Sequence, residues 1–154
     1  MNTLSVHSAM SGGVEYSIPI DYNAIQESEL ITRAEFYYDK ALKSGGELSE
    51  DTTAALNLYT MLKNKTPENQ NYSLRLGKLY DLIGKDRYAK GNYYQAMGVN
   101  TNSPAPYYYL GDFYLKRAQY RKALKMYKKA YALGYSENED MLNKMEIIKR
   151  KLGI

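Results

Sequence analysis

The feature that most constrains this chain is a match of its sequence to itself at a distance of 34 residues. The paired positions are Leu76 and Leu110, Gly77 and Gly111, Tyr80 and Tyr114, Ala89 and Ala123, Tyr93 and Tyr127, and Ala96 and Ala130. Composition alone does not explain six matches in one register, even in a chain with 18 tyrosines. A repeat of this length is typical of architectures that stack similar units, each of which buries a face against the next.

Each copy has the pattern of two amphipathic helices. In the later copy, apolar and small residues recur at steps of three and four along one helical face, and they are Tyr107, Leu110, Gly111, Tyr114 and Ala118. The second helix carries Ala123, Tyr127 and Ala130 in the same way. A glycine inside a helix costs about 1 kcal/mol relative to alanine. Its presence at the same place in both copies therefore predicts that the two helices approach closely there.

These residues resemble the tetratricopeptide repeat (TPR) family, whose pattern is Trp-x2-Leu-Gly-x2-Tyr, then Ala-x3-Phe, then Ala and Pro. The later copy reads Tyr107-x2-Leu110-Gly111-x2-Tyr114, then Ala123-x3-Tyr127, then Ala130. It departs from the family by placing Tyr at the Trp and Phe positions and Tyr135 at the Pro position. The resemblance implies an all-α fold, with three helix-turn-helix repeats in a right-handed solenoid that ends in a capping helix.

The same pattern sets the expected domain boundaries. Residues 1–27 show no helical period and are expected to form a flexible or extended arm. The three repeats are expected at residues 28–69, 70–103 and 104–137, with the first one degenerate, and the capping helix at residues 138–154.

In the degenerate repeat, Leu30, Ala34, Tyr37 and Ala41 are expected to share one face of the first helix. Gly45 and Gly46 should end that helix, and Ser49 or Thr52 should cap the next. Ser136 or Asn138 should cap the last helix. That helix carries an apolar stripe made of Met141, Leu142, Met145, Ile148 and Leu152.

Composition argues against an enzyme. The chain has no cysteine and one histidine, His7, which excludes the common zinc sites and argues against a Ser-His-Asp triad. It also lacks a glycine-rich phosphate loop and an HExxH motif. We therefore expect no catalytic residues, no metal and no cofactor. No apolar run is long enough to span a membrane, and no positive charge precedes Arg33, so a cytoplasmic location is expected.

Charge is divided unevenly along the chain. Residues 1–69 hold 5 Lys and Arg against 10 Asp and Glu, whereas residues 70–154 hold 16 against 7. A basic cluster falls within thirteen residues and consists of Arg117, Arg121, Lys122, Lys125, Lys128 and Lys129. These side chains alternate with the apolar stripe, so they are expected on the outer, convex surface. The first interpretation is a solvated helix face, and the second is a surface for nucleic acid or an acidic protein.

The resemblance supplies a candidate site. In TPR proteins the first helices of successive repeats line a concave groove that receives an extended peptide or a helix. Carried onto this sequence, the groove residues are Ile31, Glu35, Tyr38, Leu74, Lys78, Asp81, Leu82, Tyr108, Tyr109, Asp112, Leu115 and Lys116. Leu74, Leu82, Tyr108 and Leu115 are expected to form an exposed apolar track, which usually marks an interaction surface. Packing against the N-terminal arm or another protomer is the alternative interpretation.

One groove chemistry is excluded by the residues. TPR domains that clamp a C-terminal carboxylate use Lys and Asn on the first groove helix, Asn on the second, and Lys and Arg on the third. The corresponding residues here are Ile31 and Glu35, Arg75, then Ala105 and Tyr109. We therefore expect an apolar, tyrosine-mediated grip on an internal segment of a protein client.

Three functions are consistent with the sequence. The favoured one is a non-enzymatic protein-interaction module, either an adaptor or a chaperone. Its overall plan is similar to that of the small TPR chaperones of bacterial type III secretion, a similarity that implies a homodimer formed through the N-terminal segment. A structural subunit of a pilus or secretion apparatus is the alternative. Nucleic-acid binding through the basic convex face is the least favoured.

Overall fold

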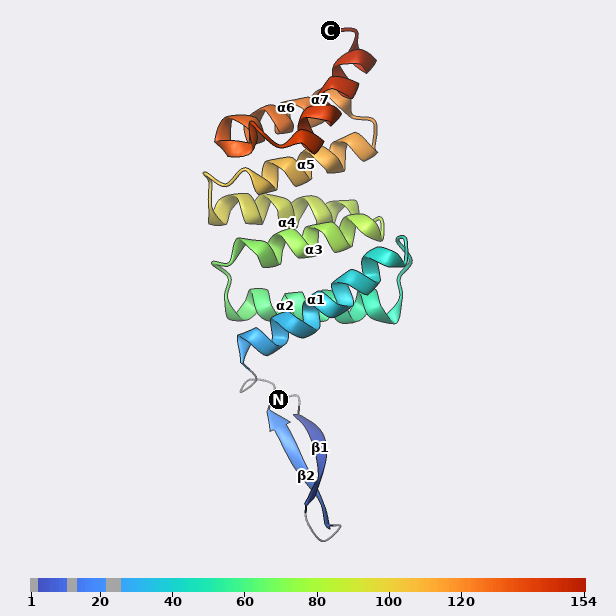
Figure 1. The fold of residues 1–154 in the computed structure, drawn as a ribbon, viewed down its shortest axis with the longest axis vertical. Helices are drawn as coiled ribbons and strands as arrows, with labels where there is room; N and C mark the ends of the chain where they lie inside the picture. Colours follow the sequence, from blue (N-terminus) through green and yellow to red (C-terminus); the bar gives the residue numbers. More distant parts are fainter. Residues whose placement is uncertain (1–2, 11–13, 22–25) are drawn as a thin grey trace.

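The computed structural model describes the backbone of residues 3–10, 14–21 and 26–154, and the side chains of residues 26–154. Within residues 26–154 the helices stack into a solenoid (Figure 1). They are α1 (Glu27–Lys43), α2 (Glu50–Lys65), α3 (Gln70–Leu82), α4 (Asp86–Val99), α5 (Ala105–Lys116), α6 (Tyr120–Ala130) and α7 (Glu139–Leu152). A short π-helical segment, η2 (Tyr131–Tyr135), joins α6 to α7.

The helices pair as the 34-residue repeat predicts. Contacts are most extensive within the pairs α1–α2, α3–α4 and α5–α6, and α7 packs on α6. Helices α4 and α6 begin 34 residues apart, at Asp86 and Tyr120. This arrangement confirms the predicted fold of three helix-turn-helix repeats followed by a final helix.

Two strands precede the solenoid. Strand β1 (Thr3–Met10) runs antiparallel to β2 (Val14–Asp21), with Thr3 opposite Asp21 and Met10 opposite Val14. The sequence pattern indicates extended structure near β2 but does not predict that the segments pair. Residues 1–2, 11–13 and 22–25 of the expected arm lie outside the described residues, as does the side chain of His7.

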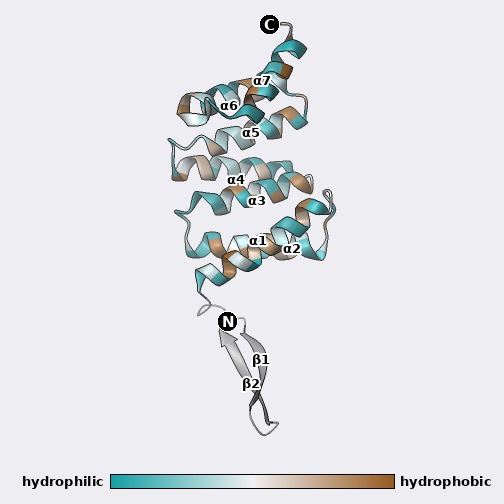
Figure 2. Cartoon of the chain, viewed as in Figure 1, coloured by the Kyte–Doolittle hydropathy of each residue, from teal (hydrophilic) through white to brown (hydrophobic). Residues whose placement is uncertain are grey.

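The core is unusually rich in tyrosine. Tyr59, Tyr93 and Tyr127 are among the largest fully buried side chains, and each belongs to the second helix of a repeat. Tyrosine ranks as mildly hydrophilic, and in Figure 2 the strongly hydrophobic colour is limited to short stretches of the helices. Buried hydroxyl groups need partners. No buried polar side-chain atom of the described residues lacks one.

The two repeat glycines provide space for these rings. A Cβ atom placed on Gly77 would lie 2.6 Å from Cε1 of Tyr93. One placed on Gly111 would lie 2.9 Å from Cζ of Tyr127 and closer still to two other atoms of that ring. The close approach predicted from the sequence is therefore confirmed. The atoms that occupy the space belong to a tyrosine of the partner helix.

The structure decides between the alternative helix caps. The Ser49 side chain accepts a hydrogen bond from the backbone N–H of Thr52 at 3.2 Å, and Asn138 does the same for Met141 at 2.9 Å. Gly45 and Gly46 follow α1 with φ of 72° and 101°. These positive angles favour glycine and let the chain leave the helix.

One core residue of the degenerate repeat was missed. Tyr37, which was assigned to the packed face of α1, is only half-buried, whereas Tyr38, which was assigned to the groove, is also part of the core, with 3% exposure. Its ring packs edge-on against Tyr59, with centroids 6.0 Å apart. Both residues follow Ala34 at a helical step, three and four residues later, so periodicity alone does not separate them.

Candidate binding groove

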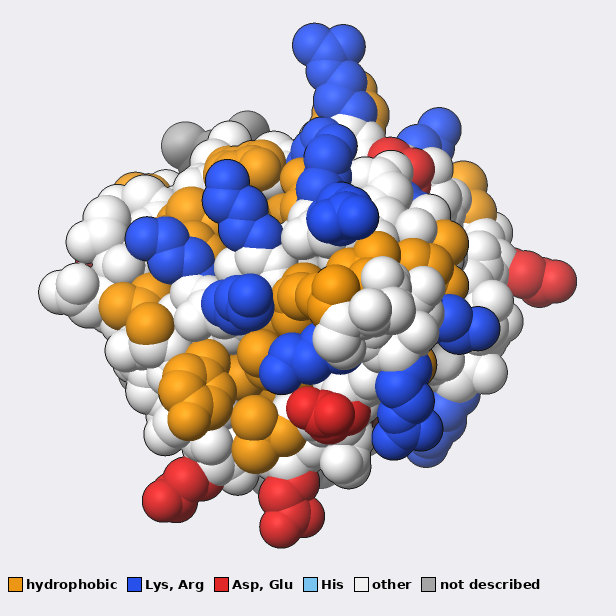
Figure 3. Space-filling model, turned by 90° about the horizontal axis from the view of Figure 1, so that it is seen from above, with side chains coloured by type: hydrophobic (Ala, Val, Ile, Leu, Met, Phe, Trp, Pro, Cys, Tyr) orange, Lys and Arg blue, Asp and Glu red, His pale blue; other side chains and the backbone are white. Residues whose placement is uncertain are grey.

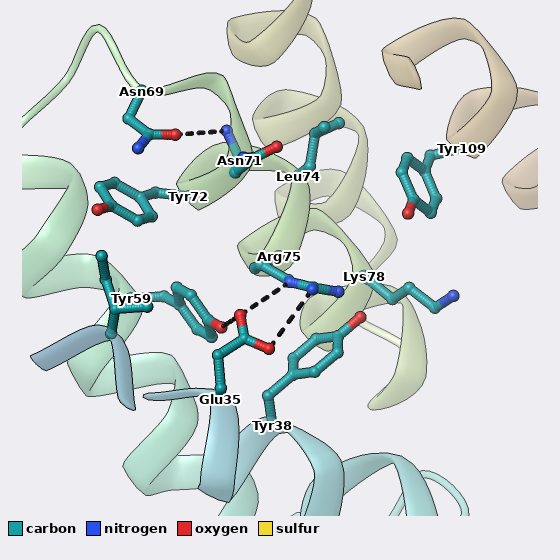
Figure 4. Close-up of a pocket in the computed structure, with 11 residues that line it drawn as sticks. Glu35, Tyr38, Tyr59, Asn69, Asn71, Tyr72, Leu74, Arg75, Lys78 and Tyr109 are labelled. Atoms are coloured by element: carbon teal, nitrogen blue, oxygen red, sulfur yellow. Dashed lines mark hydrogen bonds and ion pairs between the residues drawn. The ribbon is translucent and has the colours of Figure 1, made fainter. Parts of the chain in front are cut away.

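The first helices α1, α3 and α5 contribute to a hollow of about 240 Å³. Six of the predicted groove residues line this hollow, and they are Ile31, Glu35, Tyr38, Leu74, Lys78 and Tyr109. The lining is completed by Arg75, which the sequence analysis placed at a groove position without including it in the site, and by four residues that it did not assign to the groove, Tyr59, Asn69, Asn71 and Tyr72. Figure 4 shows that side chains from helices far apart in sequence meet here. The sequence prediction therefore located the hollow but missed much of its polar lining.

A polar cluster forms one side of the hollow. The Tyr59 hydroxyl donates a hydrogen bond to Oε1 of Glu35 at 2.5 Å. Nε of Arg75 lies 3.4 Å from the same carboxylate, and its guanidinium carbon lies 4.3 Å from the centroid of the Tyr38 ring (Figure 4). Burial, together with the hydrogen bond to Glu35, raises the pKa of Tyr59 well above its ordinary value. The charges of Glu35 and Arg75 therefore compensate each other within the protein.

Lys78 also lies beside an aromatic ring but, unlike Arg75, forms no ion pair with a carboxylate among the described residues. Its Nζ lies 5.4 Å from the centroid of the Tyr109 ring. Tyr109 in turn stacks on Tyr93, with centroids 6.1 Å apart and planes 3° from parallel. Among the residues that the structure describes, Lys78 has no ion pair with a carboxylate. The hollow therefore contains a positive charge beside an aromatic ring. This charge contributes to the lowered pKa of Asp140, but within the described residues the two groups form no ion pair.

The predicted exposed apolar track is not present. Leu74 is only 6% exposed and belongs to the core, and Leu82, Tyr108 and Leu115 are half-buried and pack against the core. An inner helix of a solenoid has neighbours on both sides. Residues one position away from its main packing stripe are therefore also covered, which a helical pattern taken one helix at a time does not show.

The final helix covers the third-repeat part of the groove. Lys144 of α7 lies 2.9 Å from Asp112 and 2.7 Å from Asp140, and the Tyr108 hydroxyl donates a hydrogen bond to Asp140. The Tyr108 ring also packs against Tyr135, with centroids 5.7 Å apart. Tyr108 and Asp112, which were expected to face a partner, thus face α7.

The charges of this cluster affect one another. Burial and the hydrogen bond to Asp140 raise the pKa of Tyr108 to about 12. The hydrogen bond from Lys144 lowers the pKa of Asp140 below its ordinary value. Burial alone would lower the pKa of Lys144, but its bonds to Asp140 and Asp112 outweigh burial and raise it. The cluster therefore holds α7 against α5 through compensated charges.

Two further groove positions form structural ion pairs. Asp81 lies 2.7 Å from Nη2 of Arg117 and 3.6 Å from Nζ of Lys116. Arg117 also binds Asp86 at 2.5 Å, and only 18% of its side chain is exposed. Arg117 was expected in the basic convex cluster. It instead joins α5 to α3 and α4, and the other five members of the cluster are exposed.

Neither a membrane-spanning helix nor a metal-binding cluster is found among the described residues. None of their helices is both long enough and apolar enough to cross a membrane. Within the same residues, no group of three His, Cys, Asp or Glu side chains is arranged to hold a metal ion.

The groove geometry can be compared with that of known proteins. No known protein family and no curated protein sequence matches the chain. Solved structures do match it. The TPR domain of Sgt2 from Aspergillus fumigatus is 20% identical, with a TM-score of 0.68, over 82% of this chain and 79% of that one. The fold is therefore that of TPR domains.

Two other similar structures contain a peptide. The first TPR of Spaghetti (RPAP3), bound to the HSP90 peptide SRMEEVD, is 18% identical, with a TM-score of 0.67, over 84% of this chain and all of that one. The type III secretion chaperone SycD from Yersinia enterocolitica, in complex with a peptide of the translocator YopD, is 17% identical. Its TM-score is 0.65, and the match covers 84% of this chain and 98% of that one.

Proposed function

We propose that this chain, which has the TPR fold, is a non-enzymatic protein-interaction module, an adaptor or chaperone that holds a segment of a client protein in its concave groove. The observation that carries this proposal is the hollow between α1, α3 and α5, where Lys78 lies beside Tyr109 without a carboxylate partner among the described residues. A concave site with aromatic walls and a few polar groups is the usual form of a binding pocket.

The chemistry of the hollow defines the segment that it fits. Lys78 favours a carboxylate, and the ring of Tyr109 provides a flat surface for an apolar or aromatic side chain. Because Glu35 and Arg75 already pair with each other, they contribute less to binding a charged group. We expect an extended segment with an acidic residue next to an apolar one, whereas the sequence led us to expect a mostly apolar segment.

The similar structures support the proposal at the level of the fold. Spaghetti and SycD, whose folds resemble this one, are both solved with a bound peptide. The SycD likeness also favours a secretion chaperone acting in the bacterial cytoplasm as the finer form of this proposal. Neither likeness identifies the client, because sequence identity is low in both cases.

The proposal is tested by selecting peptides from a random library on the wild-type chain and measuring their affinities for two variants. Lys78→Glu places a negative charge in the hollow. Arg87→Glu makes the same change in charge at an exposed residue of α4 that does not line the hollow. We expect Lys78→Glu to weaken binding about tenfold or more and Arg87→Glu to change it little. Equal effects of the two variants would exclude the hollow as the binding site.

A further inference from the structure

An open furrow at the C-terminal end of the solenoid is separate from the concave groove. It encloses about 550 Å³ between the end of α6, η2 and α7. Its lining consists of Lys128, Tyr131, Leu142, Met145, Glu146 and Lys149. Tyr131 is 47% exposed, although it is a large aromatic residue. Seen from the α7 end, Figure 3 shows apolar side chains lying between lysines and arginines.

The packing of α7 explains why the furrow is open. The stripe of Met141, Met145 and Ile148 is buried as part of the core cluster that includes α6. Leu142 lies at the edge of this stripe and is half-buried. Helix α7 is the last helix of the described residues, and it packs on α6 and, through Lys144, against α5. The apolar floor formed by Tyr131 and Leu142 is therefore left without a covering element in the part of the chain that the structure describes.

The orientation of α7 also differs from that of a repeat helix. Ile147 lies 34 residues after Phe113 and thus at the equivalent place, yet Ile147 is 48% exposed and Phe113 only 2%. Helix α7 has therefore turned a different face toward the solenoid than α5 does. This difference makes the furrow a property of the cap and not a copy of the groove between repeats.

The walls of the furrow carry two lysines and one glutamate. Lys128 forms no ion pair among the described residues, and Lys149 pairs only with Glu146 of its own helix, at 3.5 Å. Lys125 and Lys129, on the neighbouring surface of α6, are also exposed. An apolar floor between two lysines is complementary to a helix that carries apolar residues on one side and carboxylates at its edges.

We propose that this furrow is a second docking surface and that it binds an acidic amphipathic helix of a partner protein. The apolar residues of that helix lie on Tyr131 and Leu142, and its carboxylates pair with Lys128 and Lys149. Helix α7 has 14 residues and is about 21 Å long, so it can support roughly four turns of a helix packed along it. The proposal does not depend on peptide binding in the concave groove.

A nucleic acid fits the furrow less well. Phosphate groups would pair with any exposed lysine, so they would not distinguish Lys128 from the adjacent Lys129. A phosphate backbone would leave the apolar floor formed by Tyr131 and Leu142 uncovered. Charge reversals at Lys128 and at Lys129 can therefore distinguish an acidic helix from a nucleic acid.

The experiment uses the full chain and two labelled synthetic peptides of about 17 residues, one helical turn longer than α7. Both have leucines at helical spacing, and the other positions are mostly glutamate in one and lysine in the other. Fluorescence anisotropy measures their affinities for the wild type, Lys128→Glu and Lys129→Glu. We expect the glutamate peptide alone to bind the wild type. Lys128→Glu should weaken that binding about tenfold, and Lys129→Glu no more than about threefold.

A second pair of variants tests the apolar floor. Tyr131→Glu and Ile147→Glu replace side chains that are almost equally exposed, at 47% and 48%. Only the first lies in the furrow, because Ile147 is about 160° around α7 from Lys149. Tyr131→Glu should abolish measurable binding and Ile147→Glu should leave it unchanged. Failure of the glutamate peptide to bind, or equal losses within either pair, would overturn the proposal. The proposal would also be overturned if a labelled single-stranded DNA oligonucleotide displaced the peptide and if Lys128→Glu and Lys129→Glu weakened the binding of that oligonucleotide equally.

Discussion

The close packing of Gly77 against Tyr93 leads to a prediction whose size follows from the structure. In Gly77→Ala, the new Cβ would lie 2.6, 2.7 and 3.0 Å from three atoms of the Tyr93 ring, so that the ring must move. Tyr93 is 1% exposed and is held between Tyr109 and Phe113, at centroid distances of 6.1 and 6.4 Å. Overpacking a core costs about 1–3 kcal/mol. This cost outweighs the gain of up to about 1 kcal/mol that alanine normally brings to a helix.

The matched control is Gly91→Ala, in the middle of α4, where a Cβ meets nothing within 4 Å. We expect thermal unfolding to show a midpoint lower by up to about 8 °C for Gly77→Ala and higher by up to about 4 °C for Gly91→Ala. In a Tyr93→Leu background, where the ring is absent, Gly77→Ala should lose most of its cost. Equal midpoints for the two glycine variants would refute the assignment of Gly77 to close packing.

Three further predictions concern the turn between helices, an ion pair and the tyrosines. Ala118 has a φ of 54°, and the equivalent residue of the preceding repeat, Gly84, has a φ of 76°. Since positive φ angles favour glycine, Ala118→Gly should stabilise the chain by about 1 kcal/mol and Gly84→Ala should destabilise it. Urea unfolding would measure both changes. Arg117→Met leaves two carboxylates without their main partner and should lower the free energy of unfolding by about 1–3 kcal/mol; no change in the denaturant midpoint would contradict this role. Burial raises the pKa of Tyr72 and of Tyr108 to about 12, so the folded chain keeps these protons after the unfolded chain loses them near pH 10. The contribution of these two tyrosines to the free energy of unfolding is therefore fully present below pH of about 10 and falls as the pH rises toward 12. The helical circular dichroism signal should disappear together with the appearance of tyrosinate absorbance.

The 34-residue register predicted most of the fold because the matching residues make their contacts within a helix pair. Gly77, Gly111 and the tyrosines that face them follow directly from the 34-residue register. Contacts between pairs were harder to predict. Leu74 lies outside the intra-repeat stripe but is buried by its other neighbours, and only the stacked structure shows this. The pairing of β1 with β2 was also missed, because the sequence there carries no clear period.

The candidate site was predicted only in part, for a related reason. The resemblance to TPR proteins placed Glu35 and Lys78 on the groove side. It could not show that Glu35 pairs with Arg75 while Lys78 lacks an ion pair with a carboxylate among the described residues. Arg117 looked like one of a run of surface cations, whereas its acidic partners lie 31 and 36 residues away. Which charges are compensated depends on side chains from different repeats, and that information is not contained in the periodicity.

The proposed groove is tested most directly by mapping where a selected peptide binds. Backbone amide resonances of the full chain would be followed by NMR during titration with a peptide enriched on the wild type. We predict that the largest shifts fall on residues of α1, α3 and α5 around Lys78 and Tyr109, and that Lys78→Glu removes them. Shifts confined to the outer helices α2, α4 and α6, or shifts that persist in Lys78→Glu, would contradict peptide binding in the concave groove.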